Sequence, residues 1–296
     1  SYFAVWGKYI PGTFGTSAFT LKRVIKALVW DTNGVLGTGA GVSATYIFVF
    51  VLFGAFLKYS GFSQFINDIA LTLVGQTPGG PAKVAVIASA LMGMINGSAI
   101  ANVATTGTIT IPLMKKIGYE PTFAGAVEAV ASTGGQLVPP VMGAACFVMA
   151  EYIGVPYSKI MLAGLIPAVL YYMSAFIAVH LRAKRLGMVG LPKDQLPKAK
   201  EALKKRGHLL IPFVAVIVMI LMQYTVSMAA IIGIILVLIV SNFRKETRIT
   251  PKKFLDCLID GGKKSISFGI SCACIGLIIG VTTLTGIGNV LGDYVI

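Results

Sequence analysis

Residues 93–140 read GMINGSAIANVATTGTITIPLMKKIGYEPTFAGAVEAVASTGGQLVPP, and this stretch decides the fold. It is too apolar for a surface loop, yet Asn96-Gly97-Ser98 interrupts one apolar run and Thr133 to Pro140 interrupts the next. Inside a bilayer, non-helical backbone survives only where protein or a water-filled cavity covers it. Neighbouring interruptions rich in Gly and hydroxyl residues are typical of a transporter site near the midplane. We therefore expect this stretch to form half of a site for a small solute and an ion.

The composition indicates an integral membrane protein. Hydrophobic residues make up 56% of the 296 positions and charged residues 12%, against about 25% charged in a typical soluble domain. The formal net charge is +14, but the basic residues are confined to loops between apolar runs, where they set topology and contact anionic lipid. This clustering argues against nucleic acid as a partner. The four cysteines lack the spacing of a metal site, so we interpret them as small buried hydrophobes.

Apolar runs and charged loops divide the chain into five parts. Ser1 is no initiator Met and Ile296 falls inside an unfinished element, so we interpret the chain as a piece of something longer. The expected parts are a scaffold with interfacial helices (1–78), half of a transport domain (79–156), a scaffold span (157–181), a basic loop (182–207) and the start of a second repeat (208–296).

Helical periodicity and length separate helices that span the membrane from helices that lie in the interface. Residues 20–30 and 62–74 each carry one apolar stripe and are too short to span, which favours the interface. In the second of these, Asp68 is interpreted as a solvated residue. Longer apolar runs predict spans at 42–57, 160–181, 209–224, 228–240 and 265–284.

The decisive stretch is expected to contain a re-entrant hairpin followed by a discontinuous helix. Residues 84–114 would make one helix about 46 Å long, too long for a hydrocarbon core of about 30 Å. Two half-length helices meeting at Asn96-Gly97-Ser98 fit better. For residues 123–152 a single kinked helix is one reading, because Pro139 and Pro140 force at least a kink. A fully unwound centre is the preferred one.

Charge sets the expected topology. Residues 182–206 contain nine Lys or Arg against Asp194 and Glu201, so the positive-inside rule makes this loop cytoplasmic. The hairpin feet at Lys83 and Lys115-Lys116 then also face the cytoplasm. The basic residues of 20–30 do not fit the positive-inside rule, because this assignment places them on the outer side of the membrane.

Weak internal similarity predicts an inverted repeat. A short amphipathic helix (254–260) before the span 265–284 resembles the order of 20–30 and 42–57, and Gly54, Ser60-Gly61 and Asp68 recur at offsets of 225 or 226. The two units would have opposite orientations, as in many secondary transporters. The fold class expected is an all-α polytopic membrane protein with inverted repeats.

Residues 78–152, which begin PGGPAKVAVIASALMGMINGSAIANVATTG, resemble the large membrane subunit of tripartite ATP-independent periplasmic (TRAP) transporters, and most resemble the fused permeases of the TAXI type. The resemblance implies an elevator-type symporter of the bacterial or archaeal cytoplasmic membrane. It also implies a periplasmic solute-binding protein, small-subunit helices fused upstream, and a Na⁺ or H⁺ gradient in place of ATP or any organic cofactor. The second half-site would lie beyond Ile296.

Released carbonyls and hydroxyls are the expected ligands of this half-site. Hard cations such as Na⁺ prefer oxygen, so the Ser98 and Thr133 hydroxyls are candidate Na⁺ ligands. Helix N-termini expected at Ser98 and Val141 would attract a carboxylate solute. Thr105 and Thr106 could instead bond back to their own helix. The candidate binding residues are Asn96, Gly97, Ser98, Thr105, Thr106, Ser132, Thr133, Gly134, Gly135, Gln136, Pro139 and Pro140.

Glu128 is the only acidic residue inside an expected span, which makes it a candidate for proton coupling or for support of the site. The alternative is a carboxylate that neighbouring groups satisfy. Motifs of membrane-embedded enzymes, such as HExxH or a Walker A loop, do not occur in this sequence. The remaining rival function is a channel or elevator-type carrier that takes its substrate directly, without a binding protein.

Overall fold

Helices make up all the regular secondary structure in the residues that this computed structural model describes, namely 2–10, 12, 15–192, 196–197 and 199–295. This confirms the expected all-α class. The helices are α1 (Tyr2–Trp6), α2 (Leu21–Val29), α3 (Thr38–Val42), α4 (Phe48–Tyr59), α5 (Phe62–Val74), α6 (Gly80–Asn96), α7 (Ala99–Lys116), α8 (Pro121–Gly134), α9 (Ala144–Ile153), α10 (Tyr157–Arg185), α11 (Ala199–Arg206), α12 (Leu210–Leu221), α13 (Val226–Ser241), α14 (Pro251–Thr285) and α15 (Ile287–Val295).

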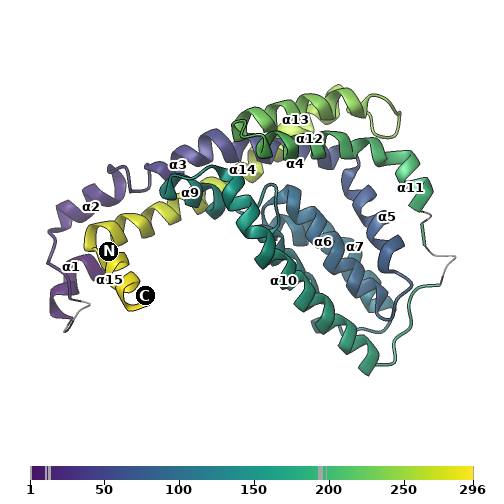
Figure 1. Ribbon diagram of the computed structural model, residues 1–296, viewed down its shortest axis with the longest axis horizontal. Coiled ribbons are helices and arrows are strands. Elements are labelled where there is room, and N and C mark those ends of the chain that lie inside the picture. Colours follow the sequence, from purple (N-terminus) through teal and green to yellow (C-terminus); the bar gives the residue numbers. More distant parts are fainter. Residues whose placement is uncertain (1, 11, 13–14, 193–195, 198, 296) are drawn as a thin grey trace.

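One layer consists of α4, α12, α13 and α14, which lie along the top of Figure 1. The π-helical turn Ser43–Ile47 joins α3 to α4 in one continuous rod. This rod runs antiparallel to α14, because Gly39 lies against Cys272 whereas Leu52 lies against Gly261. A side chain at Gly261 would overlap Leu52, so the glycine allows the two helices to approach closely.

A second group, the hairpin bundle, consists of α6, α7, α8 and α10 and hangs below this layer in Figure 1. Helices α6, α7 and α8 pack against one another, and α10 lies against α6 and α8. Helix α5 packs against α6 and connects the bundle to α4. The ends of α6 and α7 meet at Gly97-Ser98, which confirms the predicted hairpin.

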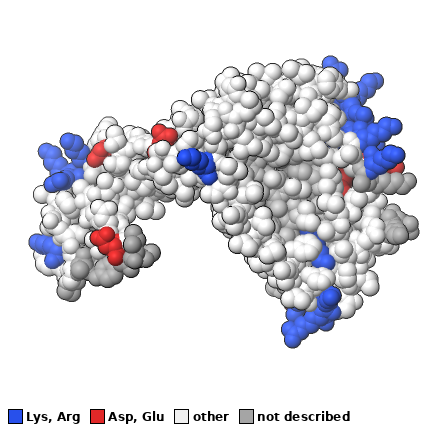
Figure 2. Space-filling model, viewed as in Figure 1, with Lys and Arg blue, Asp and Glu red and all other residues white. Residues whose placement is uncertain are grey.

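Within the described part of the chain, three rods are long and apolar enough to cross a membrane: Thr38–Tyr59, Tyr157–Arg185 and Pro251–Thr285. Two further spans were expected at 209–224 and 228–240, but α12 has 12 residues and α13 has 16. At about 1.5 Å per residue, neither reaches 30 Å. In Figure 2 most Lys and Arg on the visible face gather at the left, right and lower ends, a further basic and acidic patch lies in the narrow part left of centre, and a broad surface beside it is uncharged.

The expectation of a short helix at 254–260 followed by a separate span is wrong. Helix α14 continues without a break for 35 residues, about 52 Å. Gly261-Gly262 suggested a break, but Gly261 packs on α4 and the helix passes through it. Glycine here serves close packing, a use that sequence alone does not distinguish from a turn.

The end of α14 nevertheless repeats the end of α4. Gly61 follows α4 with φ 93°, and Gly286 follows α14 with φ 69°. These left-handed glycines are 225 residues apart, and each is followed directly by a short helix, α5 or α15. Because α4 and α14 run in opposite directions, this local geometry agrees with the predicted inversion.

The sequence suggested that Asp68 is simply a solvated residue, but in the structure it forms an ion pair. Its carboxylate lies 3.3 Å from Arg206 Nη1, which joins α5 to α11. Burial raises the pKa of Asp68, and the nearby Arg206 and Lys205 offset part of this effect. Part of the basic loop, including Lys193, Asp194 and Lys198, lies outside the described residues.

Candidate functional site: two helix interruptions in contact

The hairpin tip is a tight reversal of three residues. Asn96 ends α6, Gly97 adopts a left-handed conformation with φ 58°, and Ser98 is extended. The Ser98 hydroxyl caps α7 by accepting from the Ala101 amide at 3.4 Å. A Cβ at Gly97 would overlap the carbonyl oxygen of Met142, so both conformation and space require glycine.

The interruption between α8 and α9 lies further along the chain than expected. Helix α8 runs to Gly134, a 3₁₀ turn covers Gly135–Leu137, and α9 begins only at Ala144. The prediction of a helix N-terminus at Val141 is therefore wrong. Ser132 and Thr133 remain helical, because proline removes amide donors at 139 and 140 and restricts only the residue just before it.

The two interruptions touch. The Val141 amide donates to the Met94 carbonyl at 3.2 Å, which links the second interruption to the last turn of α6. Gly93 and Gly135 bring their backbones so close that a Cβ on either would overlap the other. The structure thus brings the last turn of α6 and Gly97 together with Gly135, Val141 and Met142 of the second interruption.

Tyr157 holds the unwound segment, and sequence reasoning missed it. Its hydroxyl lies 2.8 Å from the carbonyl oxygens of both Pro140 and Val141, and the ring stacks on Phe147. The Gly143 amide donates to the Gln136 carbonyl at 2.8 Å and closes the loop. Several carbonyls that the break frees therefore have partners within the protein. A tyrosine at the start of the next span gives no local signal of this contact.

Replacing Tyr157 by Phe should therefore destabilise the unwound segment. Removing a buried hydroxyl that satisfies two carbonyls is expected to lower the free energy of unfolding by about 1–3 kcal/mol. Thermal unfolding of the full-length protein in detergent measures this. Tyr171→Phe is the control, because its hydroxyl donates to the Val130 carbonyl within the regular helix α8. Equal midpoints for the two variants would contradict the assigned role.

Two asparagine side chains lie at the tip with polar atoms that lack partners among the described residues. Asn102 is 0% exposed; its Nδ2 donates to the Ser89 carbonyl at 2.7 Å, whereas its Oδ1 has no donor. The Nδ2 of Asn96 is likewise buried without an acceptor. A buried carbonyl-type oxygen without a donor suits a hard monovalent cation. Sequence reasoning passed over Asn102, although an amide in an apolar helix one turn after Ser98 is a signal.

The hydroxyls of Thr105 and Thr133 both bond back to their own helices. Thr105 bonds back to the Ala101 carbonyl at 2.8 Å, and Thr133 bonds back to the Ala129 carbonyl at 2.7 Å on an exposed face. Thr133 therefore does not join Ser98 in this conformation.

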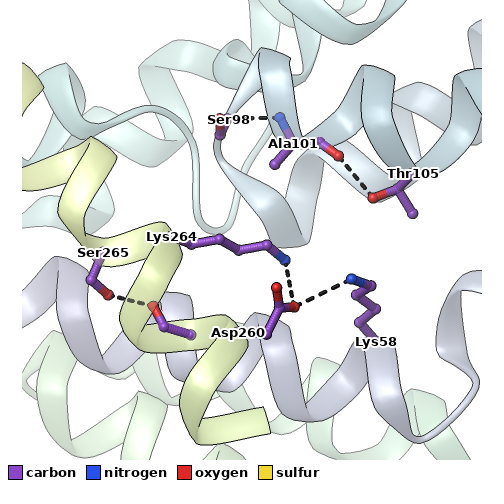
Figure 3. Close-up of polar contacts among 8 residues, drawn as sticks. Lys58, Ser98, Ala101, Thr105, Asp260, Lys264 and Ser265 are labelled. Atoms are coloured by element: carbon purple, nitrogen blue, oxygen red, sulfur yellow. Dashed lines mark hydrogen bonds and ion pairs between the residues drawn. The ribbon is translucent and has the colours of Figure 1, made fainter. Parts of the chain in front are cut away.

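Figure 3 shows Ser98 and Thr105 above a cluster in which Lys58 and Lys264 contact Asp260 Oδ2 at 3.2 and 3.0 Å. That cluster connects α4 to α14.

Glu128 forms the centre of a buried hydroxyl cluster and is 0% exposed. The Ser89 and Ser132 hydroxyls lie 3.0 Å from its Oε1, Thr110 lies 2.5 Å from its Oε2, and Thr106 also contacts Oε1. These residues come from α6, α7 and α8. No Lys, Arg or His of the described chain lies within 4.0 Å of this carboxylate.

The hydroxyl cluster accommodates either protonation state of Glu128. When the carboxylate is ionised, four hydroxyls can donate to it. When it is protonated, Glu128 can donate to Thr110 or Thr106, whose hydroxyls then turn to the carbonyls of Thr106 and Asn102 at 3.0 and 2.9 Å. Only hydroxyl rotations separate the two states. The arrangement can therefore hold or release a proton without moving a helix.

Comparison with known proteins places this geometry in a family. Residues 5–296 match the family described as "Tripartite ATP-independent periplasmic transporter, DctM component", and the chain belongs to that family. This confirms the expectation of a TRAP large membrane subunit. The TAXI-type and fused character stay predictions.

Three curated relatives carry TRAP permease names. The C4-dicarboxylate large permease protein DctM of Vibrio cholerae is 32% identical over 155 residues, 52% of this chain and 33% of the relative. The 2,3-diketo-L-gulonate large permease protein YiaN of Escherichia coli is 29% identical over 152 residues, which are 51% of this chain and 35% of the relative. The sialic acid large permease protein SiaM of Vibrio cholerae is 30% identical over 157 residues, which are 52% of this chain and 36% of the relative. The chain thus spans about a third of the length of each.

Proposed function

We propose that this chain is part of a permease that imports a small organic carboxylate by symport with a monovalent cation, Na⁺ or H⁺. The contact between the hairpin tip and the unwound segment is the observation that carries the proposal. Two non-helical segments in one membrane-embedded group of helices are expected only where backbone and polar atoms serve a ligand. The names of the three relatives state solutes that carry carboxylates, which supports this solute class.

The tip supplies complementary groups for such a cargo. The N-terminus of α7 at Ser98 and that of α9 at Gly143 offer partial positive charge to a carboxylate. The free Asn102 Oδ1, with backbone oxygens of the two interruptions, offers ligands to a cation. Residues Asn96, Gly97, Ser98 and 135–140 form this half-site, and the remaining cargo contacts come from the second repeat.

Glu128 is the candidate for H⁺ coupling, whereas the tip oxygens are the candidate for Na⁺. Glu128 is buried among hydroxyls and has no cationic partner among the described residues, and these two features support its role in H⁺ coupling. Protonation at Glu128 would turn the Thr106 and Thr110 hydroxyls from the carboxylate to carbonyls of their own helix, and so would change the hydrogen bonds between α7 and α8.

The partners that we propose are those expected for a member of this family. A periplasmic solute-binding protein delivers the solute to this multi-pass membrane protein in the cytoplasmic membrane, and small-subunit helices, fused upstream, support the scaffold. An elevator-type movement of α6, α7 and α8 past the layer of α4, α12, α13 and α14, with α10 as a scaffold span, then carries the site across. Direct uptake without a binding protein is the competing function.

Uptake by the full-length permease in proteoliposomes separates the two functions. With the cognate binding protein and an inward gradient of Na⁺ or H⁺, radiolabelled carboxylate should accumulate at least tenfold above vesicles without a gradient. Omitting the binding protein should reduce this to background. Gradient-driven uptake of equal rate without it would contradict the tripartite proposal.

A further inference from the structure

Lys83 is a buried cation without a carboxylate partner. It lies in the first turn of α6, is 2% exposed, and donates from Nζ to the Thr77 hydroxyl at 3.0 Å. The same ammonium lies 5.3 Å from the centre of the Phe176 ring. No described Asp or Glu lies within 4.0 Å of Nζ. A hydroxyl and an aromatic face compensate only part of the cost of burying this charge.

Two further polar atoms lie buried and unpartnered beside Lys83. His180, one turn after Phe176 on α10, has a buried Nδ1 with no partner among the described residues. The ring of Phe176, one turn earlier on the same helix, contacts the Lys83 ammonium. Tyr119 is 3% exposed, and its hydroxyl has no described partner either.

These groups occupy adjacent turns of the contact between α6 and α10. The Tyr119 hydroxyl and the Ala183 side chain both lie against Gly79. Gly79 precedes Lys83 by one helical turn, as the bond from the Lys83 amide to the Gly79 carbonyl shows, and Ala183 follows His180 by three residues. Lys83 contacts Phe176 on α10, His180 lies one turn further along that helix, and the Tyr119 hydroxyl lies against Gly79, so the three residues belong to one neighbourhood at the base of the hairpin.

The chemistry of this place suits an anion. Lys83 adds positive charge to the helix end that is already positive, at the start of α6. Ala82, Val179 and Ala183 are buried with Tyr119 in one apolar cluster, a tightly packed setting that favours a single atom over a phosphate group.

We propose that Lys83, Tyr119 and His180 form a binding site for a monatomic anion, chloride, at the base of the hairpin. The Lys83 ammonium supplies the charge, and the Tyr119 hydroxyl and the His180 Nδ1–H tautomer supply hydrogen bonds. The bound ion ties the start of α6 to the end of α10. This site is separate from the hairpin tip and does not depend on the proposed cargo.

Halide replacement in the full-length protein tests this. Chloride, titrated against gluconate at constant ionic strength, should raise the thermal unfolding midpoint in a saturable way. Crystals grown in bromide should show an anomalous peak between Lys83 Nζ and the Tyr119 hydroxyl. Absence of both effects would overturn the proposal, as would a shift produced by inorganic phosphate or by vesicles of anionic lipid but not by chloride.

Three variants locate the effect. Lys83→Met should abolish the chloride shift, and Tyr119→Phe, which keeps the charge, should weaken the apparent affinity about tenfold. Lys116→Met is the matched control, because this exposed lysine at the other hairpin foot should leave the shift unchanged. A chloride response in Tyr119→Phe equal to that of the parent protein would contradict the proposed site even if Lys83→Met failed to fold.

Discussion

Replacing Glu128 by Gln is expected to reduce proton-driven uptake at least tenfold while leaving the protein folded. The carboxamide keeps the shape of the side chain, and its oxygen and amino group can still bond to the hydroxyls of Ser89, Thr106 and Thr110. It cannot take up or release a proton, so any step that requires this exchange stops. Uptake in proteoliposomes under an imposed pH gradient measures the effect.

Glu151→Gln is the matched control, because this carboxylate is exposed near the end of α9. Its uptake should stay within about twofold of the parent protein, in line with the small effect of most surface substitutions. If Glu128→Gln retained full uptake and full dependence on the pH gradient, Glu128 would be a structural carboxylate. The tip oxygens and Na⁺ would then carry the coupling.

Gly97→Ala should abolish uptake and lower the free energy of unfolding by about 2–4 kcal/mol. Its φ of 58° is strained for alanine, and the added methyl would overlap the carbonyl oxygen of Met142. Relief requires the hairpin tip to move away from the unwound segment, which separates the two halves of the site. Uptake assays and thermal unfolding measure the two effects separately.

Gly125→Ala provides the comparison within the same bundle. Gly125 is helical, and a Cβ built on it meets no atom within 4 Å. Alanine there should be neutral or slightly stabilising, since it favours the helix. Equal losses at Gly97 and Gly125 would mean that contact between the interruptions has no special importance.

The hairpin could be predicted because its signals are local. An apolar run too long for one membrane crossing, broken by Asn96-Gly97-Ser98, leaves few alternatives. The left-handed Gly97 and the Ser98 cap are what these residue types favour. The general position of the second interruption followed from Pro139-Pro140 in the same way.

Other features depend on neighbours that are distant in the sequence. Thr133 looked like a ligand, but it completes its own helix, and α9 starts three residues after the expected Val141. Gly261 looked like a break and proved to be a packing contact with Leu52. Tyr157 acquires its role only through the folded position of the unwound segment. The hydroxyl cluster of Glu128 likewise needs three helices together.

Accessibility of the hairpin tip tests the central claim most directly. In the full-length permease with its native cysteines replaced, Ser98→Cys should react with a membrane-impermeant thiol reagent, and saturating carboxylate solute with the coupling ion should slow the reaction at least tenfold. Gly125→Cys should show no protection by solute. If Ser98→Cys were inert under every condition, or reacted at the same rate with and without cargo, the meeting of the two interruptions would be a packing contact and not a transport site.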